Sequence, residues 1–209
     1  MSNVTIVEHP LVAHHLTRLR AKTTGPDEFR QLVRRLATLL AYEATKDLSV
    51  EAIQVATPMA EATGSRVNAR VGLVPILRAG LGMVDPMLDL LPESEVWHLG
   101  LYRDEKTAEP VEYYSRLPKG RPVDVGLVID PMLATGGSAS SALAALRDWG
   151  VPRTKLLSIL AASEGVDLIA KRYPETQLYV CAVDLRLDEN KFIVPGLGDA
   201  GDRIFHTLP

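Results

Sequence analysis

The sequence predicts an α/β protein with a mostly parallel central sheet flanked by helices. Four short segments are apolar at successive positions, which is typical of strands that are covered on both faces. Segments with helical periodicity lie between them, and a helix between two strands is the usual connection in a parallel sheet. At 209 residues, the chain is long enough for one domain, residues 1–209, and too short for two ordinary domains.

Strands and helices of this sheet are predicted to alternate along the chain from Arg70 onward. The predicted strands are Val71–Leu77, Val125–Ile129, Lys155–Leu160 and Leu178–Val183. The predicted helices are Gly80–Leu91, Ser138–Trp149 and Val166–Tyr173. Between the first two strands, the segments Glu95–Asp104 and Val111–Leu117 are predicted to pair as an exposed hairpin.

The first fifty residues are predicted to be helical. One helix covers His9–Arg20, and a longer helix opens at Gly25-Pro26-Asp27. The longer helix has apolar residues on one face and a run of charged residues on the other. We interpret the charged face as solvated surface.

The composition limits the kinds of partner and the compartment. The formal net charge of −3 disfavours a bulk nucleic-acid binder, which normally has a basic face. No apolar run is long enough to span a membrane, and the start of the sequence does not resemble a signal peptide. The single cysteine, Cys181, fits a reducing compartment, so we expect a cytoplasmic protein without nucleic-acid or membrane partners.

Three polar clusters are predicted at the carboxyl ends of strands, where open α/β sheets bind their ligands. They are Arg78-Ala79-Gly80, the loop from Asp130 to Ser138, and the segment after Asp184. The loop reads DPMLATGGS and leads into a helix, but it has no lysine. Such a loop suits a single terminal phosphate better than a triphosphate. An ordinary strand-to-helix turn in which Ser138 caps the helix fits the pattern equally well.

The other polar residues also allow two interpretations each. Asp130 fits a ligand of sugar hydroxyls or an acid that caps a turn. Arg78 fits a second anion site, such as one for a diphosphate, or plain surface. The charged stretch from Arg103 to Lys106 fits a mobile flap or an exposed hairpin. The glycine-rich stretch Phe192–Phe205 fits a ligand-shaped loop or an ordinary tail.

Four motifs taken together decide between these interpretations. They are PILRAGLGM, LYRDE with EPVEYYSRLP, VIDPMLATGGS and VPGLGDAGDR, and they occur in this order between about Pro75 and Thr207. In these motifs the chain resembles the uracil phosphoribosyltransferases, a branch of the type I phosphoribosyltransferase family. Pro131 stands where other branches have a second acid, which is a feature of the uracil branch. The resemblance implies the type I phosphoribosyltransferase fold with an N-terminal helical segment, a protruding β-hairpin and a C-terminal base-binding loop.

The resemblance also implies a reaction and a set of site residues. Uracil and 5-phosphoribosyl-1-diphosphate (PRPP) would give UMP and diphosphate, as in pyrimidine salvage. The expected PRPP-binding residues are Arg78, Arg103, Asp130, Pro131, Met132, Leu133, Ala134, Thr135, Gly136, Gly137, Ser138 and Asp199. Among them, the amides of 134–138 would hold the 5-phosphate, Asp130 the ribose hydroxyls, and the two arginines the diphosphate. The expected uracil-binding residues are Ile193, Gly198, Asp199 and Ala200.

Catalysis is expected to rest on charge neutralisation and positioning, with Mg²⁺ as the cofactor. Asp130 and Asp199 are the candidate catalytic residues, and either is a candidate general base for uracil N1–H. No direct side-chain ligation of the metal is expected, because PRPP and water, near Asp199, would hold Mg²⁺. The resemblance further implies a homo-oligomer, a dimer or higher, and makes GTP a candidate effector.

Two departures and one alternative function accompany this resemblance. The family commonly has tyrosine in place of Phe192 and glycine in place of His206, so a hydroxyl contact and the packing of the tail are in question. The alternative is a non-catalytic, PRPP-sensing regulator of pyrimidine genes that binds RNA. Such a protein needs a basic surface, which the charge of −3 and the lack of a dense Lys/Arg stripe disfavour.

Overall fold

A computed structural model describes residues 3–103, 110–115 and 120–207, with the backbone alone described for 99–103 and 110–115. The main sheet has the strand order β1-β11-β10-β8-β4-β5, and all its pairs are parallel. The short strand β9 also pairs with β10. This arrangement confirms the predicted fold class. The strands are β1 (Val4–Ile6), β4 (Val71–Pro75), β5 (Glu95–Val96), β8 (Val125–Ile129), β9 (Met132–Leu133), β10 (Arg153–Ala162) and β11 (Gln177–Asp184).

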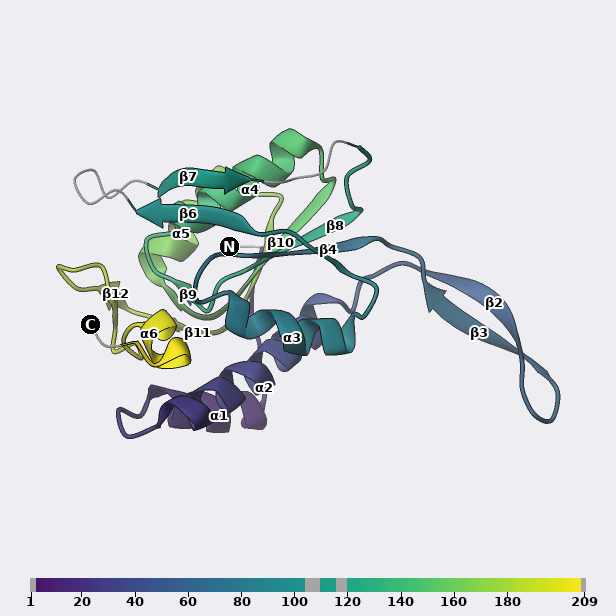
Figure 1. The fold of residues 1–209 in the computed structure, drawn as a ribbon, viewed down its shortest axis with the longest axis horizontal. Coiled ribbons are helices and arrows are strands. Elements are labelled where there is room, and N and C mark those ends of the chain that lie inside the picture. Colours follow the sequence, from purple (N-terminus) through teal and green to yellow (C-terminus); the bar gives the residue numbers. More distant parts are fainter. Residues whose placement is uncertain (1–2, 104–109, 116–119, 208–209) are drawn as a thin grey trace.

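Helices cover both faces of the sheet (Figure 1). Helices α1 (Pro10–Arg20), α2 (Pro26–Ala44) and α3 (Leu81–Leu90) lie on one face, and α4 (Gly137–Trp149) and α5 (Ser163–Arg172) lie on the other. Successive strand residues therefore alternate between two apolar layers. Leu73 and Leu127 are buried in the layer beneath α2, whereas Val74 and Val128 are buried in the layer beneath α4. Burial on both sides explains why the strands are apolar at every position.

Two predicted elements near the middle of the chain differ from the structure. The segment predicted as one strand, Glu95–Asp104, divides into β5 in the main sheet and β6 (Leu99–Arg103) in the hairpin with β7 (Pro110–Ser115). The division occurs because the backbone N–H of Trp97 donates to Leu73 O at 2.9 Å, and the Trp97 ring packs against Trp149. Asp104 and residues 116–117 of the prediction lie outside the described residues.

The sequence analysis missed an extended arm and a short strand. Strands β2 (Val50–Ala56) and β3 (Glu61–Val67) pair as an antiparallel hairpin that projects from the body (Figure 1). Apolar side chains of this arm are solvent-exposed, among them Val50, Val55, Met59 and Val67. Strand β1 was also missed, because its three residues lie in a region that we predicted to be helical.

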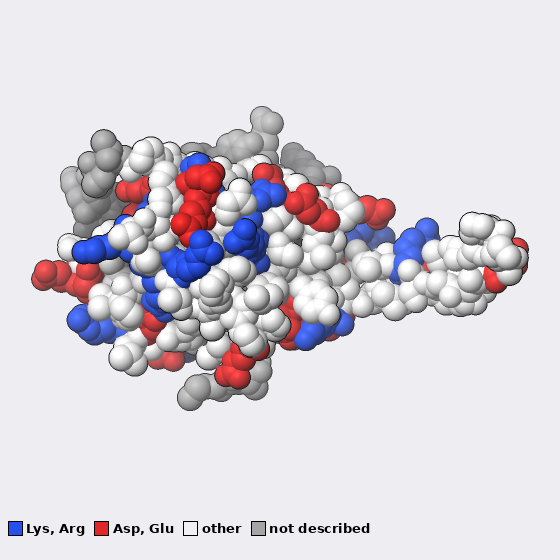
Figure 2. Space-filling view, turned by 90° about the horizontal axis from the view of Figure 1, so that it is seen from below, with Lys and Arg blue, Asp and Glu red and all other residues white. Residues whose placement is uncertain are grey.

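The face formed by α1, α2 and α3 has mixed charge. Figure 2 shows basic and acidic side chains next to one another on this face. Arg34 of α2 pairs with Asp85 and Asp89 of α3, each at 3.3 Å, and Arg18 pairs with Glu28. The charged run of α2 is therefore an ion-paired surface and not a basic stripe.

The C-terminal segment folds back beside the N-terminal helices. It comprises the strand pair β12 (Arg186–Leu187) and β13 (Ile193–Val194), followed by α6 (Ala200–Phe205). Helix α6 lies near α1 and α2 (Figure 1), and Arg30 of α2 donates to Ile204 O. Over the described ranges, no helix is long and apolar enough to cross a membrane.

Candidate active site

The loops that follow β4 and β8 meet at the carboxyl edge of the sheet. The N–H of Ile76 donates to Ile129 O at 3.0 Å, and the N–H of Gly80 donates to Ile76 O at 2.9 Å. A Cβ atom on Gly80 would lie 2.6 Å from Ile129 O, so this close approach requires glycine. The peptide between Leu77 and Arg78 is cis. The first predicted polar cluster is thus packed directly against the start of the second.

The loop from Asp130 to Ser138 surrounds a cavity of about 170 Å³, which we call the phosphate-loop cavity. Its lining comprises Asp130, Met132, Leu133, Ala134, Thr135, Gly136, Gly137, Ser138 and Ala139. Pro131 is buried and does not line the cavity; its carbonyl accepts a hydrogen bond from Leu160 N. A single small space therefore faces eight of the nine residues predicted for this loop.

The interpretation of Ser138 as a helix cap is wrong. Helix α4 begins at Gly137, and its N-cap residue is Gly136, whose φ of 82° lies in the left-handed region that favours glycine. The N-cap residue has no side chain that could cap the helix, and the Thr135 hydroxyl accepts a long hydrogen bond, 3.4 Å, from Gly137 N. The first N–H groups of a helix have no intrahelical partner, so they are suited to an anion in the cavity.

Helix α5 supports the phosphate loop from behind. Gly165 lies so close that a Cβ atom there would be 2.5 Å from Ala134 O and 2.9 Å from Leu133 O. A Cβ atom on Gly136 would in turn be 3.3 Å from Gly165 O. The contact fixes the backbone on which the loop amides depend.

Asp130 has a strongly perturbed carboxyl group. Desolvation by burial raises the pKa of Asp130 to about 7, although a 3.3 Å hydrogen bond from Met132 N favours the carboxylate. By exposed area the residue is only half-buried, because one side of it faces the cavity. A carboxyl group that changes charge near neutral pH at the end of a strand is typical of a functional site.

A second cavity, of about 190 Å³, joins all three predicted clusters, and we call it the tail cavity. Ala79 lines it from the first cluster, and Met132 and Ala134 line it from the second. The C-terminal segment contributes Lys191, Phe192, Ile193, Gly198, Asp199, Ala200 and Gly201. All four residues predicted for the base therefore lie around one space beside the phosphate loop.

Asp199 lies at the boundary between this cavity and α6. Its Oδ1 accepts a hydrogen bond from Asp202 N at 2.9 Å, so Asp199 is the N-cap of the helix. Its other oxygen, Oδ2, makes no hydrogen bond to another residue of the described chain. The residue is exposed, and its carboxylate is accessible from the cavity.

The two arginines predicted for the diphosphate differ in what the structure shows. Arg78 is exposed and pairs with Asp202, with Nη2 3.1 Å from Oδ1. This pair places the guanidinium next to α6 and Asp199. Arg103 ends β6, and its side chain lies outside the described part of the structure, as do Asp104, Glu105 and Lys106 of the predicted flap.

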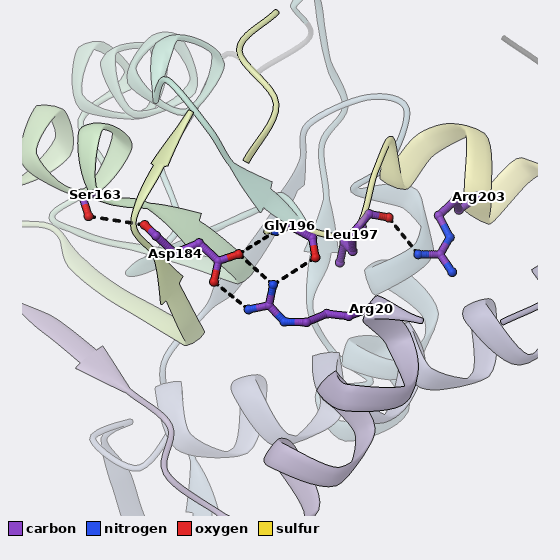
Figure 3. A network of polar contacts seen from close by, with 6 residues as sticks. All are labelled: Arg20, Ser163, Asp184, Gly196, Leu197 and Arg203. Carbon is purple, nitrogen blue, oxygen red and sulfur yellow. Dashed lines mark hydrogen bonds and ion pairs between the residues drawn. The ribbon is translucent and has the colours of Figure 1, made fainter. Parts of the chain in front are cut away.

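The sequence analysis missed a pair of residues that holds the C-terminal segment, Arg20 and Asp184 (Figure 3). The Arg20 guanidinium donates to both oxygens of Asp184, each at 2.7 Å. The same guanidinium donates to Gly196 O, and Gly196 N donates to Asp184 Oδ2, both at 2.9 Å. Burial works to raise the pKa of Asp184, but the bonds from Arg20 and Gly196 outweigh it and hold this pKa below its usual value.

Arg203 makes a second set of contacts that the sequence analysis missed. Its guanidinium donates to Leu197 O at 2.7 Å (Figure 3) and to three backbone carbonyls at the end of α1 and in the connection to α2, those of Leu19, Ala21 and Thr24. It also lies over the ring of Phe29, 4.2 Å from the centroid. Asp184 had a detectable signal, since it follows a buried strand as Asp130 does. Arg20 and Arg203 had none.

The two departures from the family pattern both line a larger hollow of about 640 Å³ between the C-terminal segment and the start of α2. Phe192 is 45% exposed and lines this hollow as well as the tail cavity. His206 ends α6 with a φ of 55°, in the left-handed region that favours glycine. Its side chain is exposed, so the backbone accommodates histidine there without displacing the core.

The described residues contain no group of three or more His, Cys, Asp or Glu side chains arranged to hold a metal ion. Asp199 is an exposed carboxylate at the edge of the tail cavity.

Comparisons with known proteins agree with this geometry. A sequence model described as "Uracil phosphoribosyltransferase" matches residues 6–207. The uracil phosphoribosyltransferase of Roseiflexus sp. (strain RS-1) is 55% identical over 207 residues, which is 99% of this chain and 100% of the relative. That of Finegoldia magna is 50% identical, with 99% and 100% covered. Among solved structures, the AQ2163 protein from Aquifex aeolicus superimposes with a TM-score of 0.91 at 35% identity, with 97% of each chain covered.

Proposed function

Because this chain belongs to the uracil phosphoribosyltransferase family, we propose that it transfers the phosphoribosyl group of PRPP to N1 of uracil. The products are UMP and diphosphate. The observation that carries the proposal is the tail cavity, where the loop after β4, the phosphate loop and the C-terminal segment meet. The two substrates contain three groups to be bound, the base, the ribose phosphate and the diphosphate. One of the three polar clusters is available for each of them.

The phosphate-loop cavity is the site for the 5-phosphate of PRPP. The amino end of α4, whose N-cap residue is a glycine, offers backbone N–H groups and a positive dipole end to this anion. Asp130, at the mouth of the loop, accepts hydrogen bonds from the ribose hydroxyls. With a pKa of about 7, this carboxyl is partly protonated near pH 7, and hydrogen bonds from hydroxyl donors favour its charged form.

The tail cavity is the site for uracil. Ile193 is buried and supplies an apolar wall, and the backbone of Gly198, Asp199 and Ala200 supplies amides and carbonyls. Uracil presents an acceptor–donor–acceptor edge, and a rigid backbone can present the complementary pattern. Cytosine reverses part of this edge, so it leaves buried groups unsatisfied, which discriminates strongly.

The diphosphate is bound by Arg78 and Arg103. The leaving diphosphate accumulates negative charge while C1 of the ribose becomes cation-like. The guanidinium groups neutralise the negative charge on the diphosphate. Mg²⁺, when bound, would neutralise further charge on the diphosphate. The exposed carboxylate of Asp199 suits this ion through a bridging water, because Mg²⁺ prefers oxygen donors and retains several waters. Asp130 and Asp199 are the candidates for accepting the N1 proton of uracil.

The experiment that tests this proposal is UMP formation from uracil and PRPP with Mg²⁺, with cytosine and orotate run in parallel. We expect UMP from uracil alone among the three bases. The variant Asp199→Asn is expected to make much less UMP, and because asparagine is also a good N-cap, α6 is retained. Asp167→Asn, at an exposed position of α5, is the matched control.

A folded wild-type protein that binds PRPP and forms no UMP would contradict the proposal and favour the alternative, a PRPP-sensing RNA-binding regulator. The mixed charge of the α1–α2–α3 face (Figure 2) disfavours that alternative. Retention on heparin or RNA that weakens steeply with salt would support it.

We extend the proposal to the assembly and regulation of the protein. Residues 1–209 are proposed to act as a single phosphoribosyltransferase domain, since loops of the same sheet line both cavities. The β2–β3 arm is proposed to pack on a second copy of the chain, because an isolated two-stranded hairpin is at best marginally stable in water, and this one exposes Met59 at 94%. Sedimentation of the wild type and of Met59→Lys tests the dimer.

We also propose GTP as an effector and the cytoplasm as the location of the protein. The family resemblance makes GTP a candidate effector, and the UMP assay with and without GTP tests it. The cytoplasmic location rests on the single cysteine and is tested by cell fractionation.

A further inference from the structure

We infer that Arg20 and Asp184 are positioning residues for uracil binding: together they hold the Gly196 peptide, and so the loop that forms the base site, in place. The inference rests on the proposed function, because it assigns the base to the tail cavity. It concerns two side chains that lie outside both cavities and outside the four family motifs.

The geometry of the pair is that of a rigid, two-pronged contact. Two parallel hydrogen bonds of 2.7 Å join the guanidinium to the carboxylate, and such bidentate pairs fix orientation as well as distance. The Asp184 side chain is 8% exposed and that of Arg20 is 24% exposed, so water screens the contact little. Asp184 is the last residue of β11, which pairs with β1 and β10, and it therefore anchors Arg20 to the main sheet.

The pair holds the two peptide units that flank Gly196. The N–H of Gly196 donates to Asp184, and the carbonyl of Gly196 accepts from Arg20, each at 2.9 Å (Figure 3). Gly196 has a φ of 59°, and a Cβ atom there would lie 2.0 Å from Ile193 O. The turn from Ile193 to Gly196 is therefore tight, and Arg20 and Asp184 bind both polar backbone groups of Gly196.

Arg203 holds the next residue by separate contacts. It donates to Leu197 O at 2.7 Å while it donates to the Leu19 and Ala21 carbonyls at the end of α1. The backbone at Gly196 and Leu197 is thus fixed immediately before Gly198. The peptides of 198–200, which follow without a break, line the tail cavity.

Arg20 and Asp184 act on the base through this backbone and not by touching it. Neither side chain lines the tail cavity. A backbone that offers hydrogen bonds to a flat base must hold its amides and carbonyls within a few tenths of an ångström, and a displacement of about 1 Å can cost about a hundredfold in rate. Loss of the pair is expected to weaken uracil binding and to leave the phosphate loop, which is held by α5, unchanged.

Two variants and one control test this inference. Arg20→Lys keeps the charge but loses the two-pronged geometry. The double variant Arg20→Gln/Asp184→Asn keeps hydrogen-bonding groups at both positions without leaving a buried charge unpaired. The control is Arg18→Gln. Arg18 lies on the same helix as Arg20, and this variant removes its exposed ion pair with Glu28 of α2.

We expect KM for uracil to rise about tenfold or more in both variants, with KM for PRPP within about twofold of the wild-type value. Hydrogen exchange of the segment 193–199 is expected to quicken in both variants and to stay unchanged in Arg18→Gln. This second measurement does not depend on activity, so it separates a failure of the inference from a failure of the proposed function. Folded variants with wild-type exchange in this segment, or with equal rises in both KM values, would overturn the inference.

Discussion

Arg78 and Asp202 form an ion pair, with Nη2 3.1 Å from Oδ1, although 124 positions separate them in the chain. The Thr207 hydroxyl donates to the same Asp202 oxygen at 2.5 Å, and the bonds from Thr207 and Arg78 hold the pKa of Asp202 below its usual value. In the free protein, then, the arginine proposed for the diphosphate already has an anionic partner. When PRPP binds, its diphosphate would replace the Asp202 carboxylate as the partner of Arg78.

We predict that Asp202→Asn lowers KM for PRPP, because Arg78 no longer has to leave a carboxylate. The pair is largely exposed, so the effect should be at most about fivefold and should shrink at high salt. Initial rates at low and high salt measure it. Thr207→Val, which removes a hydrogen bond from the same oxygen and leaves the ion pair, is the control. An unchanged KM at low salt would contradict the prediction, and a raised KM would show that the pair helps PRPP to bind.

Asp130 should make the stability of the free protein depend on pH. Its carboxyl has a pKa of about 7 when folded and an ordinary value near 3.8 when unfolded. Between these values the folded state binds more protons, so the free energy of unfolding should fall as pH rises from about 4 to 7 and level off above. The difference between the two pKa values corresponds to a change of about 4 kcal/mol in the free energy of unfolding. Because the cavity admits water to the carboxyl, we expect about half of this change.

Urea unfolding of the wild type and of Asp130→Asn at several pH values measures this dependence. The difference in unfolding free energy between the two proteins isolates the contribution of Asp130, since all other groups are shared. A difference that stays constant from pH 4 to pH 8 would contradict the prediction.

Gly165→Ala should damage the phosphate loop. Alanine is normally favoured over glycine in a helix, but here its Cβ would lie 2.5 Å from Ala134 O, so the loop must move. We expect KM for PRPP to rise about tenfold, with a loss of about 1–3 kcal/mol in stability. Gly64→Ala, where the new Cβ would meet only ordinary contacts at 3.8 Å, is the control. Equal kinetics for the two variants would show that the loop yields without cost.

Lys155 and Asp47 should matter for stability and not for activity. Lys155 is 1% exposed, and its ammonium donates to Ala44 O at 2.5 Å and to Asp47. Asp47→Ala leaves this buried cation without its carboxylate, which should cost about 3 kcal/mol. The double variant Asp47→Ala/Lys155→Met should recover most of that loss, because no buried charge remains. Denaturant unfolding measures both.

The control for this prediction is Arg153→Met, because Arg153 also pairs with Asp47, at 2.6 Å, but is exposed. Its loss should cost no more than about 1 kcal/mol. All of these variants should keep the wild-type kcat, since the start of β10 lies at the opposite end of the strand from the site. A lower kcat in a folded variant would show that the two ends of the sheet are coupled.

The sheet and its loops could be predicted from the sequence because their determinants are local. Strands such as β8 are apolar at every position, and the turn after it contains its own glycines. The four motifs, taken together, then indicated which family the chain resembles. The structure then placed Ile193, Gly198, Asp199 and Ala200 around one cavity together with Met132 and Ala134 of the phosphate loop.

What could not be predicted depends on contacts between distant parts of the chain. Nothing near Arg20 in the sequence distinguishes it from other arginines at helix ends, and only the fold brings it to Asp184 and Gly196. The β2–β3 arm was missed for a different reason. Its strands are exposed and lack a regular alternation of apolar and polar residues, so the periodicity that identifies strands is weak there.

The dependence of the base site on α1 has a consequence for biosynthesis. Arg203 donates to Leu19 O across 184 positions, so the ribosome makes one partner of this contact near the beginning of translation and the other near the end. The sheet and phosphate loop can form on a nascent chain before residues 193–203 emerge, whereas the uracil pocket cannot. The base site is therefore completed only when the last helix has been synthesised, so we expect a chain that ends before residue 193 to form no UMP.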